Sequence, residues 1–310
     1  MKNIAWQGIY PALLTPFTAN DEIDYPLFQK NLEAQLAAGV AGIIIGGSLG
    51  EASTLTSQEK HVFLSYCVKV VEGRVPVIIN VAEQSTKVAI AMAKEAEQLG
   101  ADGLMLLPPL KYKADDEEVV TYFQAVAAAT SLPILIYNNP VDYGIKVSIA
   151  MFEQLLPYPN IQAVKESTRD LANITNMINR FGNRFRILGG VDTISLESLM
   201  LGADGLVAGL VDAFPQETVA MYKLVKAKRY DEALAIYRWF MPLLELDIHP
   251  KLVQYIKLAA TAVGLSSEYV RAPRLVIKGA ERERVLQIIN DALANRPELP
   301  DYLNLQVELV

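Results

Sequence analysis

A lysine that ends an apolar run is the strongest candidate for chemistry in this sequence. In Ile161–Lys165 the alternation of a strand places Ile161, Ala163 and Lys165 on one face. A lysine at the end of such a strand lies where solvent is scarce, and desolvation lowers the pKa of an amine. A neutral amine can attack a carbonyl carbon and form a Schiff base. The same pattern also suits a lysine whose amine simply extends to solvent at the rim.

Two more segments carry reactive groups at the ends of apolar runs. Tyr137 ends Leu132–Tyr137 and can either relay a proton or form an apolar wall. The turn Gly46–Glu51 follows Ala41–Ile45, and its glycines can expose backbone N–H groups to a small anion such as a carboxylate. Ser48 adds a hydroxyl to that turn.

Several other chemistries are disfavoured by what the sequence lacks. His61 and His249 have no partner at ligand spacing, and Cys67 is the only cysteine, so we expect no metal site and no internal disulfide. Neither Gly-x-Ser-x-Gly nor a phosphate-binding Gly-x-x-x-x-Gly-Lys-Ser/Thr motif is present. The formal charge of 28 − 35 = −7 argues against a nucleic-acid partner.

Repeated alternation of short apolar runs with longer helical patterns defines the elements that position these residues. The runs are Ile9–Leu14, Ala41–Ile45, Val75–Val81, Gly103–Leu107, Leu132–Tyr137, Ile161–Lys165, Phe185–Leu188 and Asp204–Ala208. The helical patterns between them are Tyr25–Ala38, Ser57–Glu72, Thr86–Leu99, Asp115–Thr130, Ser148–Leu156, Arg169–Phe181 and Ser195–Leu201. Eight such units predict an α/β fold, a (β/α)8 TIM barrel. A doubly wound sheet would want an early Gly-x-Gly-x-x-Gly turn, which is absent.

Helical periodicity continues for about 100 residues beyond the eighth run, over Pro215–Lys226, Tyr230–Leu246, Pro250–Val263 and Ala280–Ala294. The first of these closes the barrel. We therefore predict a barrel over residues 1–226 and a C-terminal helical bundle over residues 227–310 that packs on it. The end, residues 296–310, is either a tag-like tail or a segment that contacts a partner.

The sequence also bears on localisation. Its first residues contain no apolar signal run, and no window of ~18 residues is apolar and free of charge. We therefore expect a cytoplasmic protein with no membrane partner.

Taken together, these motifs identify a resemblance that covers nearly the whole chain. They are Gly47-Ser48-Leu49-Gly50-Glu51, Tyr137-Asn138-Asn139-Pro140 and Val164-Lys165-Glu166-Ser167, with Pro11–Phe17 and Gly205–Gly209 in matching order. The chain resembles the family of dihydrodipicolinate synthase and N-acetylneuraminate lyase, which are Schiff-base barrel enzymes. Matching Gly-[Ser/Thr]-Thr-Gly-Glu, Tyr-Asn-x-Pro and the lysine strand at separate places makes chance agreement very improbable.

The resemblance implies a role for each matching residue. Lys165 would form the Schiff base and Tyr137 would relay the proton. Gly47, Ser48 and the backbone of Leu49 would hold the substrate carboxylate, and Asn139 would belong to the binding site. Gly189 and Val207 would line the floor of the pocket. No cofactor is implied, because the iminium itself draws electrons, and the family typically forms a homotetramer built as a dimer of dimers.

Departures from the family pattern narrow the range of substrates that we expect. Dihydrodipicolinate synthases carry an arginine where this chain has Asp142, which would repel the second carboxylate that the arginine binds. Leu49 replaces a motif hydroxyl. The synthases' tyrosine pair after the fourth strand appears here as Leu110 and Lys111, with Tyr112 adjacent, and whether Lys111 or Tyr112 reaches a site stays open.

The Ser-Leu-Gly-Glu turn and Tyr137–Gly144 look most like a deaminase branch of the family. That branch converts Δ1-pyrroline-4-hydroxy-2-carboxylate, an intermediate of hydroxyproline catabolism, into 2,5-dioxopentanoate and ammonia. We therefore predict a lysine Schiff-base lyase or deaminase for a small 2-oxo acid or cyclic imine carboxylate. The alternatives are an aldolase or dehydratase of a sugar-derived 2-oxo acid, true dihydrodipicolinate synthesis, and a non-catalytic barrel that retains the pocket.

Overall fold

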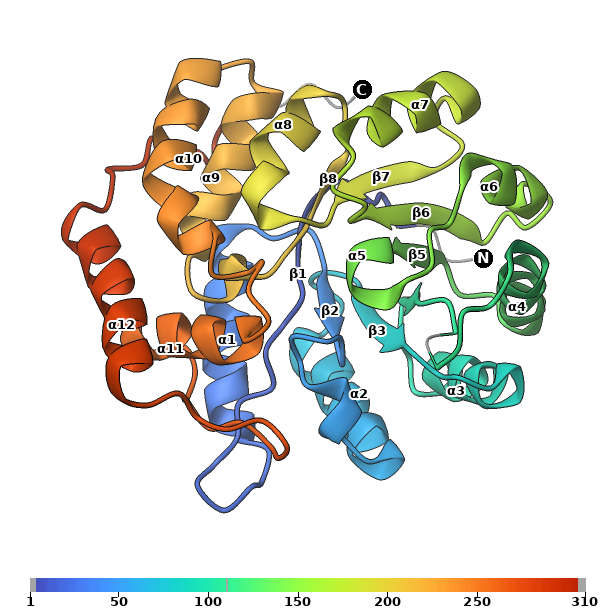
Figure 1. Ribbon diagram of the computed structural model, residues 1–310, viewed down its shortest axis with the longest axis horizontal. Helices are drawn as coiled ribbons and strands as arrows, with labels where there is room; N and C mark the ends of the chain where they lie inside the picture. The colour runs from blue at the N-terminus through green and yellow to red at the C-terminus, as the bar shows by residue number, and fades with distance from the viewer. Residues whose placement is uncertain (1–3, 110, 306–310) are drawn as a thin grey trace.

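Among the residues that the structure describes, eight parallel strands form the centre of the molecule. The computed structural model describes residues 4–109 and 111–305. The strands follow the order β1-β8-β7-β6-β5-β4-β3-β2 in one sheet. Ala12 pairs with Ile44 across the remaining seam, and the Leu13 N–H donates to the Ile44 carbonyl at 2.9 Å. The sheet therefore curls into a nearly closed barrel with its helices outside (Figure 1), and the predicted (β/α)8 fold is confirmed.

The strands form where the apolar runs predict them. Their bounds are β1 Gly8–Pro11, β2 Ile43–Ile45, β3 Val77–Val81, β4 Gly103–Leu106, β5 Ile134–Asn138, β6 Ile161–Glu166, β7 Arg186–Gly189 and β8 Gly205–Ala208. Nearly every residue in them is buried, because helices cover the outer face and side chains fill the barrel. This arrangement gathers the carboxyl ends of all eight strands at one mouth.

The helices of the barrel alternate with the strands. They are α1 Tyr25–Ala38, α2 Ser57–Val71, α3 Thr86–Gln98, α4 Asp116–Ala129, α6 Ile149–Leu155, α7 Leu171–Phe181, α8 Ser195–Met200 and α9 Pro215–Lys226, with short 3-10 turns η1 Ala52–Thr54, η2 Asp192–Ile194 and η3 Leu210–Asp212. One further short helix, α5 Pro140–Tyr143, lies at the mouth after β5 and was not predicted. Pro140 occupies its first turn and the Asn139 side chain caps it, so four residues suffice to form it.

Three more helices, α10 Tyr230–Leu244, α11 Leu252–Ala262 and α12 Gly279–Ala294, form the C-terminal extension. They lie beside α1 and α9 (Figure 1). Phe214 before α9 makes edge contacts with Trp239 and Phe240 of α10, at ring-centroid distances of 5.9 and 5.6 Å. The extension thus packs on the barrel.

The described part of the C-terminal tail also packs on the chain. Arg296 forms an ion pair with the buried Glu217 of α9, and the ring of Tyr302 is buried. Residues 306–310 of the predicted tail lie outside the described residues.

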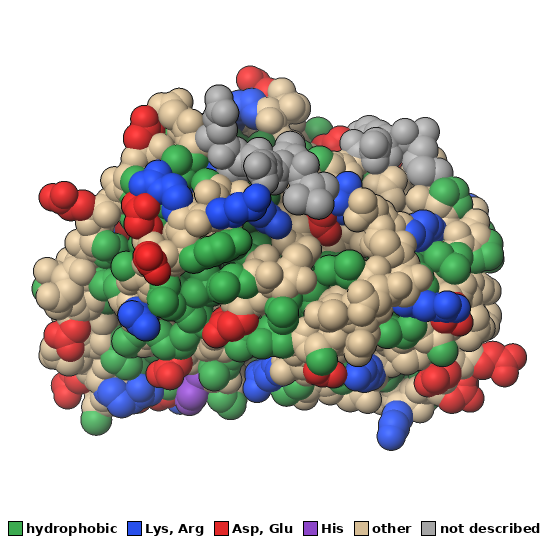
Figure 2. Space-filling view, turned by 90° about the horizontal axis from the view of Figure 1, so that it is seen from above, with side chains coloured by type: hydrophobic (Ala, Val, Ile, Leu, Met, Phe, Trp, Pro, Cys, Tyr) green, Lys and Arg blue, Asp and Glu red, His purple; other side chains and the backbone are tan. Residues whose placement is uncertain are grey.

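Surface charge is mixed on the face shown in Figure 2. Acidic and basic side chains are interspersed there around a group of hydrophobic side chains near the middle. That face therefore carries no broad field of one sign. Within residues 4–109 and 111–305, no helix combines the length and the apolar character needed to cross a membrane.

Candidate active site

A cavity of about 80 Å³ opens among the carboxyl ends of the strands. In barrels of this class the active site lies at that end. Eight of the nine predicted site residues line the cavity: Gly47, Ser48, Leu49, Tyr137, Asn139, Asp142, Lys165 and Val207. A cavity of this volume suits a ligand of a few carbon atoms rather than a nucleotide.

The ninth predicted residue, Gly189, is not among the lining residues, and Gly190 takes that position. A Cβ built on Gly189 would lie 3.0 Å from Leu206 and 3.1 Å from Ser198, in the layer between strand and helix. Successive residues of a strand face opposite sides, so a one-residue offset moves the contact from the helix layer to the mouth.

Lys165 lies near the end of β6, with only 7% of its surface exposed. Its Nζ lies 4.1 Å from the centroid of the Tyr137 ring, which belongs to the neighbouring strand β5. Burial lowers the pKa of the Lys165 amine, and the nearby acidic groups, Tyr143 and Asp247 foremost, oppose that effect. A lowered pKa makes the neutral, nucleophilic form of the amine more accessible.

Gly190 leaves room for the lysine to reach the mouth. A Cβ at this position would lie 2.7 Å from Lys165 Cγ and 2.8 Å from Cε, and 2.2 Å from the Ser167 hydroxyl oxygen. Contacts below 3 Å would displace the lysine. The Ser167 hydroxyl donates to the Gly190 carbonyl at 3.0 Å and holds Gly190 close to the strand that carries Lys165.

Two phenols stand beside the amine. The rings of Tyr137 and Tyr143 meet edge to face with centroids 5.5 Å apart. The Tyr137 hydroxyl oxygen accepts a hydrogen bond from Asn139 Nδ2 at 3.1 Å, and the Tyr143 hydroxyl is hydrogen-bonded to Ser48 Oγ. Burial raises the pKa of Tyr137 and raises that of Tyr143 to about 12. Both phenols therefore hold their protons near neutral pH and can give or pass them.

The turn after β2 presents donors to the cavity. The Glu51 and Ala52 amides close the turn by donating to the Ser48 and Gly47 carbonyls. Within the described part of the chain, the Ser48 and Leu49 amides have no acceptor. These two amides and the Ser48 hydroxyl form a group of donors of the kind that binds a carboxylate.

Helix α5 places Asp142 on the wall of the cavity. Asn139 Oδ1 accepts from the Asp142 amide at 3.1 Å, and Asn139 Nδ2 donates to Asp142 Oδ2 at 2.7 Å. Since the same Nδ2 also donates to the Tyr137 hydroxyl, one amide joins the carboxylate to the phenol. Asn139 thus orients both groups.

Several lining residues have no signal in the sequence that finds them. Tyr143 comes with the unpredicted α5, Arg169 lies exposed at the rim, and Asp247 and Ile248 come from the turn after α10. Only tertiary packing brings the extension to the mouth. Asp192, close by, is buried and accepts from the Gly209 and Leu210 amides.

The described residues that follow β4, residues 107–109 and 111–115, do not line the cavity. Lys111 and Tyr112 are absent from its lining; the Lys111 amide donates to Gln84 at 2.6 Å, and Tyr112 is 54% exposed. Leu110 lies outside the described residues.

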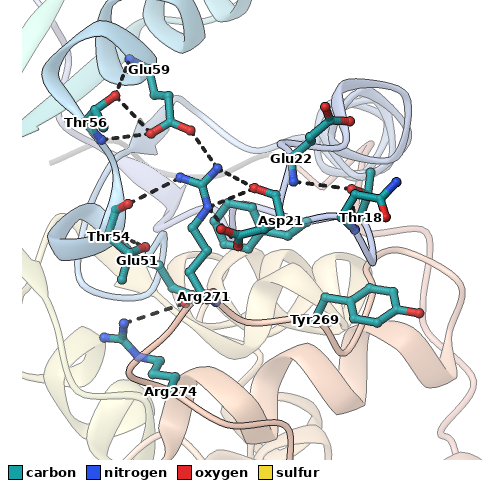
Figure 3. Close-up of polar contacts among 12 residues, drawn as sticks. Thr18, Asp21, Glu22, Glu51, Thr54, Thr56, Glu59, Tyr269, Arg271 and Arg274 are labelled. Carbon is teal, nitrogen blue, oxygen red and sulfur yellow. Dashed lines mark hydrogen bonds and ion pairs between the residues drawn. The ribbon is translucent and has the colours of Figure 1, made fainter.

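A buried ion pair joins the Gly47–Glu51 turn to the C-terminal extension. Glu51, fully buried at the end of the turn, accepts from Lys257 Nζ of α11 at 2.5 Å and from the Arg271 amide at 3.1 Å. Figure 3 shows Arg274 also directed at Glu51, and Arg271 reaching Glu59 and the Thr54 and Asp21 carbonyls. The cluster fixes the end of the Gly47–Glu51 turn.

Known proteins match this chain over most of its length. The dihydrodipicolinate synthetase family matches residues 5–292. A 4-hydroxy-tetrahydrodipicolinate synthase of Exiguobacterium sibiricum is 35% identical over 273 residues, covering 87% of this chain and 91% of that protein. One from Kosmotoga olearia is 32% identical, covering 92% and 98%.

Solved structures of similar proteins share the fold of this chain. A dihydrodipicolinate synthase of Bacillus anthracis is 29% identical with a TM-score of 0.89, covering 93% of this chain and 99% of that one. A prophage protein of the same family from E. coli K12, solved in complex with pyruvate, is 25% identical with a TM-score of 0.87, covering 93% and 99%. The sequence match over residues 5–292, together with relatives above 30% identity, places this chain in the dihydrodipicolinate synthetase family.

Proposed function

We propose that the chain deaminates Δ1-pyrroline-4-hydroxy-2-carboxylate through a Schiff base on Lys165, releasing 2,5-dioxopentanoate and ammonia. The observation that carries the substrate choice is Asp142 on the cavity wall, joined through Asn139 to Tyr137. At ~4 Å, two like charges repel by about 4 kcal/mol at an effective dielectric of 20. Asp142 therefore disfavours a second carboxylate and can accept a hydrogen bond from a substrate hydroxyl.

In this proposal each group of the cavity meets one part of the substrate. The single carboxylate binds the Ser48 and Leu49 amides and the Ser48 hydroxyl. The neutral Lys165 amine attacks C2 of the cyclic imine, and the C2–N bond of the ring breaks as the C2–Nζ iminium forms. The ring nitrogen leaves as an amine on C5, with protons passed through the Tyr137 hydroxyl.

Loss of a C3 proton turns the iminium into an enamine, which expels the C4 hydroxyl as water and leaves a C3–C4 double bond. Proton transfers from C5 and its nitrogen to C3 and C4 then convert the C5 amine into an imine, and hydrolysis at C5 and C2 completes the reaction. The net change adds one water and releases one ammonia, so atoms balance. No cofactor is required in this scheme, because the iminium withdraws the electrons that each step needs.

A second candidate is 4-hydroxy-tetrahydrodipicolinate synthesis, the activity that names the relatives from Exiguobacterium sibiricum and Kosmotoga olearia. Here Lys165 would condense pyruvate with aspartate semialdehyde. The observation that favours it is Arg169, a cation at the rim that could bind a second carboxylate.

One assay separates the candidates. Purified protein is given the pyrroline carboxylate, pyruvate with aspartate semialdehyde, or a 2-keto-3-deoxy sugar acid, and ammonia, condensation product and pyruvate are measured. We expect ammonia from the first substrate only. Rapid condensation in the second mixture would overturn the proposal, and release of pyruvate from the third would point to the aldolase alternative.

Asp142→Asn tests whether the charge of Asp142 determines which substrate the cavity accepts. The amide keeps the size of the side chain and removes its charge. We expect kcat/KM for the hydroxylated pyrroline to fall about tenfold, as for one charged hydrogen bond, and binding of dicarboxylates to improve. An unchanged kcat/KM would show that Asp142 takes no part in substrate choice.

We also propose a homotetramer built as a dimer of dimers, as the family resemblance implies. Light scattering of the purified chain measures the assembled mass. A monomer at micromolar concentration would contradict this.

A further inference from the structure

From the C-terminal extension, Asp247 reaches the mouth of the barrel and lines the same cavity as Lys165 and Tyr137. It lies in the turn between α10 and α11, where its amide donates to the Leu244 carbonyl at 3.0 Å. The preceding residue, Leu246, is only 3% exposed and anchors the turn. The carboxyl group is thus held at the cavity by packing.

The neighbouring carboxylates all have protein partners. Asp142 accepts from Asn139, Asp192 from two amides, and Asp212 from the Leu14 amide at 3.0 Å. Asp247 differs, because its carboxyl oxygens have no hydrogen bond or ion pair with any residue in the described ranges 4–109 and 111–305. A side chain directed into a substrate cavity with its oxygens uncommitted is available to a ligand.

Gly209 makes room for this carboxyl group. A Cβ at residue 209 would lie 2.5 Å from Asp247 Oδ1 and 3.2 Å from Ile256 Cδ1. The φ of Gly209 is −105°, which any residue can adopt, so glycine is needed here for space rather than for its backbone angle. The barrel end of β8 is therefore shaped to accept a group from the extension.

We infer that Asp247 is a catalytic acid, which protonates the C4 hydroxyl of the ring-opened substrate as that hydroxyl leaves. The inference rests on the proposed deaminase function. In the step, the C4–O bond breaks and the oxygen leaves as water with the proton of Asp247. The electron pair comes from the enamine on Lys165 through C2 and C3, and a C3–C4 double bond forms. Asp247 is left as a carboxylate and regains its proton from solvent or substrate.

The surroundings favour the acid form that this role requires. Burial raises the pKa of Asp247 well above its usual range, Asp192 and Asp142 add to that effect, and Lys165 and Arg169 oppose it. A carboxyl group with a raised pKa keeps its proton to higher pH and can donate it to a hydroxyl that would otherwise be a poor leaving group.

The test uses Asp247→Asn, which keeps the shape and removes the acid. Borohydride is added during turnover of the pyrroline carboxylate, and the peptide containing Lys165 is weighed. We expect the variant to trap an adduct that retains the C4 oxygen, and to release ammonia about 10²–10⁴-fold more slowly than wild type. Trapping with pyruvate should be normal, because the Schiff base itself does not need Asp247.

Glu245→Gln is the matched control, since it changes an exposed carboxylate in the same turn. It should behave as wild type. If Asp247→Asn releases ammonia at the wild-type rate, or traps the same adducts as wild type, the inference is wrong. Failure of the proposed function would look different: wild type itself would release no ammonia while still trapping pyruvate, and this role for Asp247 would fall with it.

Discussion

Among the residues that the structure describes, burial is the main cause that lowers the amine pKa of three lysines, Lys165, Lys226 and Lys257. Lys257 of α11 is paired with the buried Glu51. Lys226 of α9 is also partly buried, but its Nζ donates to the Ala203 carbonyl at 2.7 Å. Of these three lysines only Lys165 lines the cavity, beside the ring of Tyr137. Reactivity therefore depends on access to a substrate as well as on a lowered pKa.

Lys165→Ala should abolish covalent trapping, because the nucleophile is lost. With pyruvate and borohydride, wild type should gain mass on the peptide containing Lys165. The variant should gain none and lose turnover by about 10⁴-fold or more. Lys226→Ala should trap pyruvate normally. Labelling of another lysine, with activity intact in Lys165→Ala, would contradict the mechanism.

Tyr137→Phe keeps the ring beside Lys165 and removes the hydroxyl that passes protons. We expect kcat to fall about 10²–10⁴-fold. Tyr143→Phe removes instead the hydroxyl bonded to Ser48, so it should mainly raise KM. Steady-state kinetics of both variants distinguish the roles. A rise in KM alone for Tyr137→Phe would make this residue a wall of the pocket.

At the scale of elements, the Gly47–Glu51 turn depends on residues far away in the chain. Glu51 closes the turn after β2, while its partners Lys257 and Arg271 belong to the extension. Leaving one member of a buried pair uncompensated costs about 3–5 kcal/mol. The extension therefore stabilises the turn that is proposed to bind the carboxylate.

The pair of Arg271 and Glu59 gives this contact a pH dependence. The hydrogen bond from Arg271 is the main cause that lowers the pKa of Glu59 from 4.5 to about 2 (Figure 3). Between these values the unfolded chain binds a proton at Glu59 and the folded chain does not. The contribution of Glu59 to the free energy of unfolding is therefore complete above about pH 4.5 and is lost as pH falls towards 2.

Glu59→Gln should accordingly lose less stability than wild type as pH falls from 4.5 to 2. Guanidinium unfolding at several pH values in this window measures the difference. Glu22→Gln, which removes an exposed carboxylate from a neighbouring loop, is the control and should keep the wild-type slope. Equal slopes for Glu59→Gln and wild type would remove Glu59 as the cause.

The barrel elements could be predicted because local pattern determines them. Runs such as Leu132–Tyr137 are apolar on both faces, and helices such as α1 begin and end where the periodicity does. Lys165 and Tyr137 could be placed for the same reason, since both end strands. Helix α5 could not, because four residues show no periodicity. The prediction named Gly189 instead of Gly190, because a sequence pattern does not locate the end of a strand to within one residue.

Asp247 could not be predicted at all, because nothing local distinguishes it from a solvent-exposed aspartate at the end of a helix. Its place depends on how the whole extension packs against the barrel. The buried core is continuous across both, from Ile4 at the start of the barrel to Tyr302 in the tail. The predicted division at residue 226 therefore describes the order of elements along the chain. Whether the two parts also unfold separately is a question for an unfolding experiment.

The two tryptophans allow that test, because they lie in the two parts. Trp6 is buried at the start of the barrel and donates to Gln162 at 2.9 Å, while Trp239 of α10 donates to the Ala292 carbonyl of α12 at 2.9 Å. In Trp239→Phe the fluorescence reports the barrel, and in Trp6→Phe it reports the extension. Because the core is shared, we expect the fluorescence of each variant to change together with its own far-UV circular dichroism in guanidinium, as in a two-state transition. If Trp239 fluorescence in Trp6→Phe changes at a lower denaturant concentration than the circular dichroism, the extension unfolds first and residues 227–310 form a separate cooperative unit.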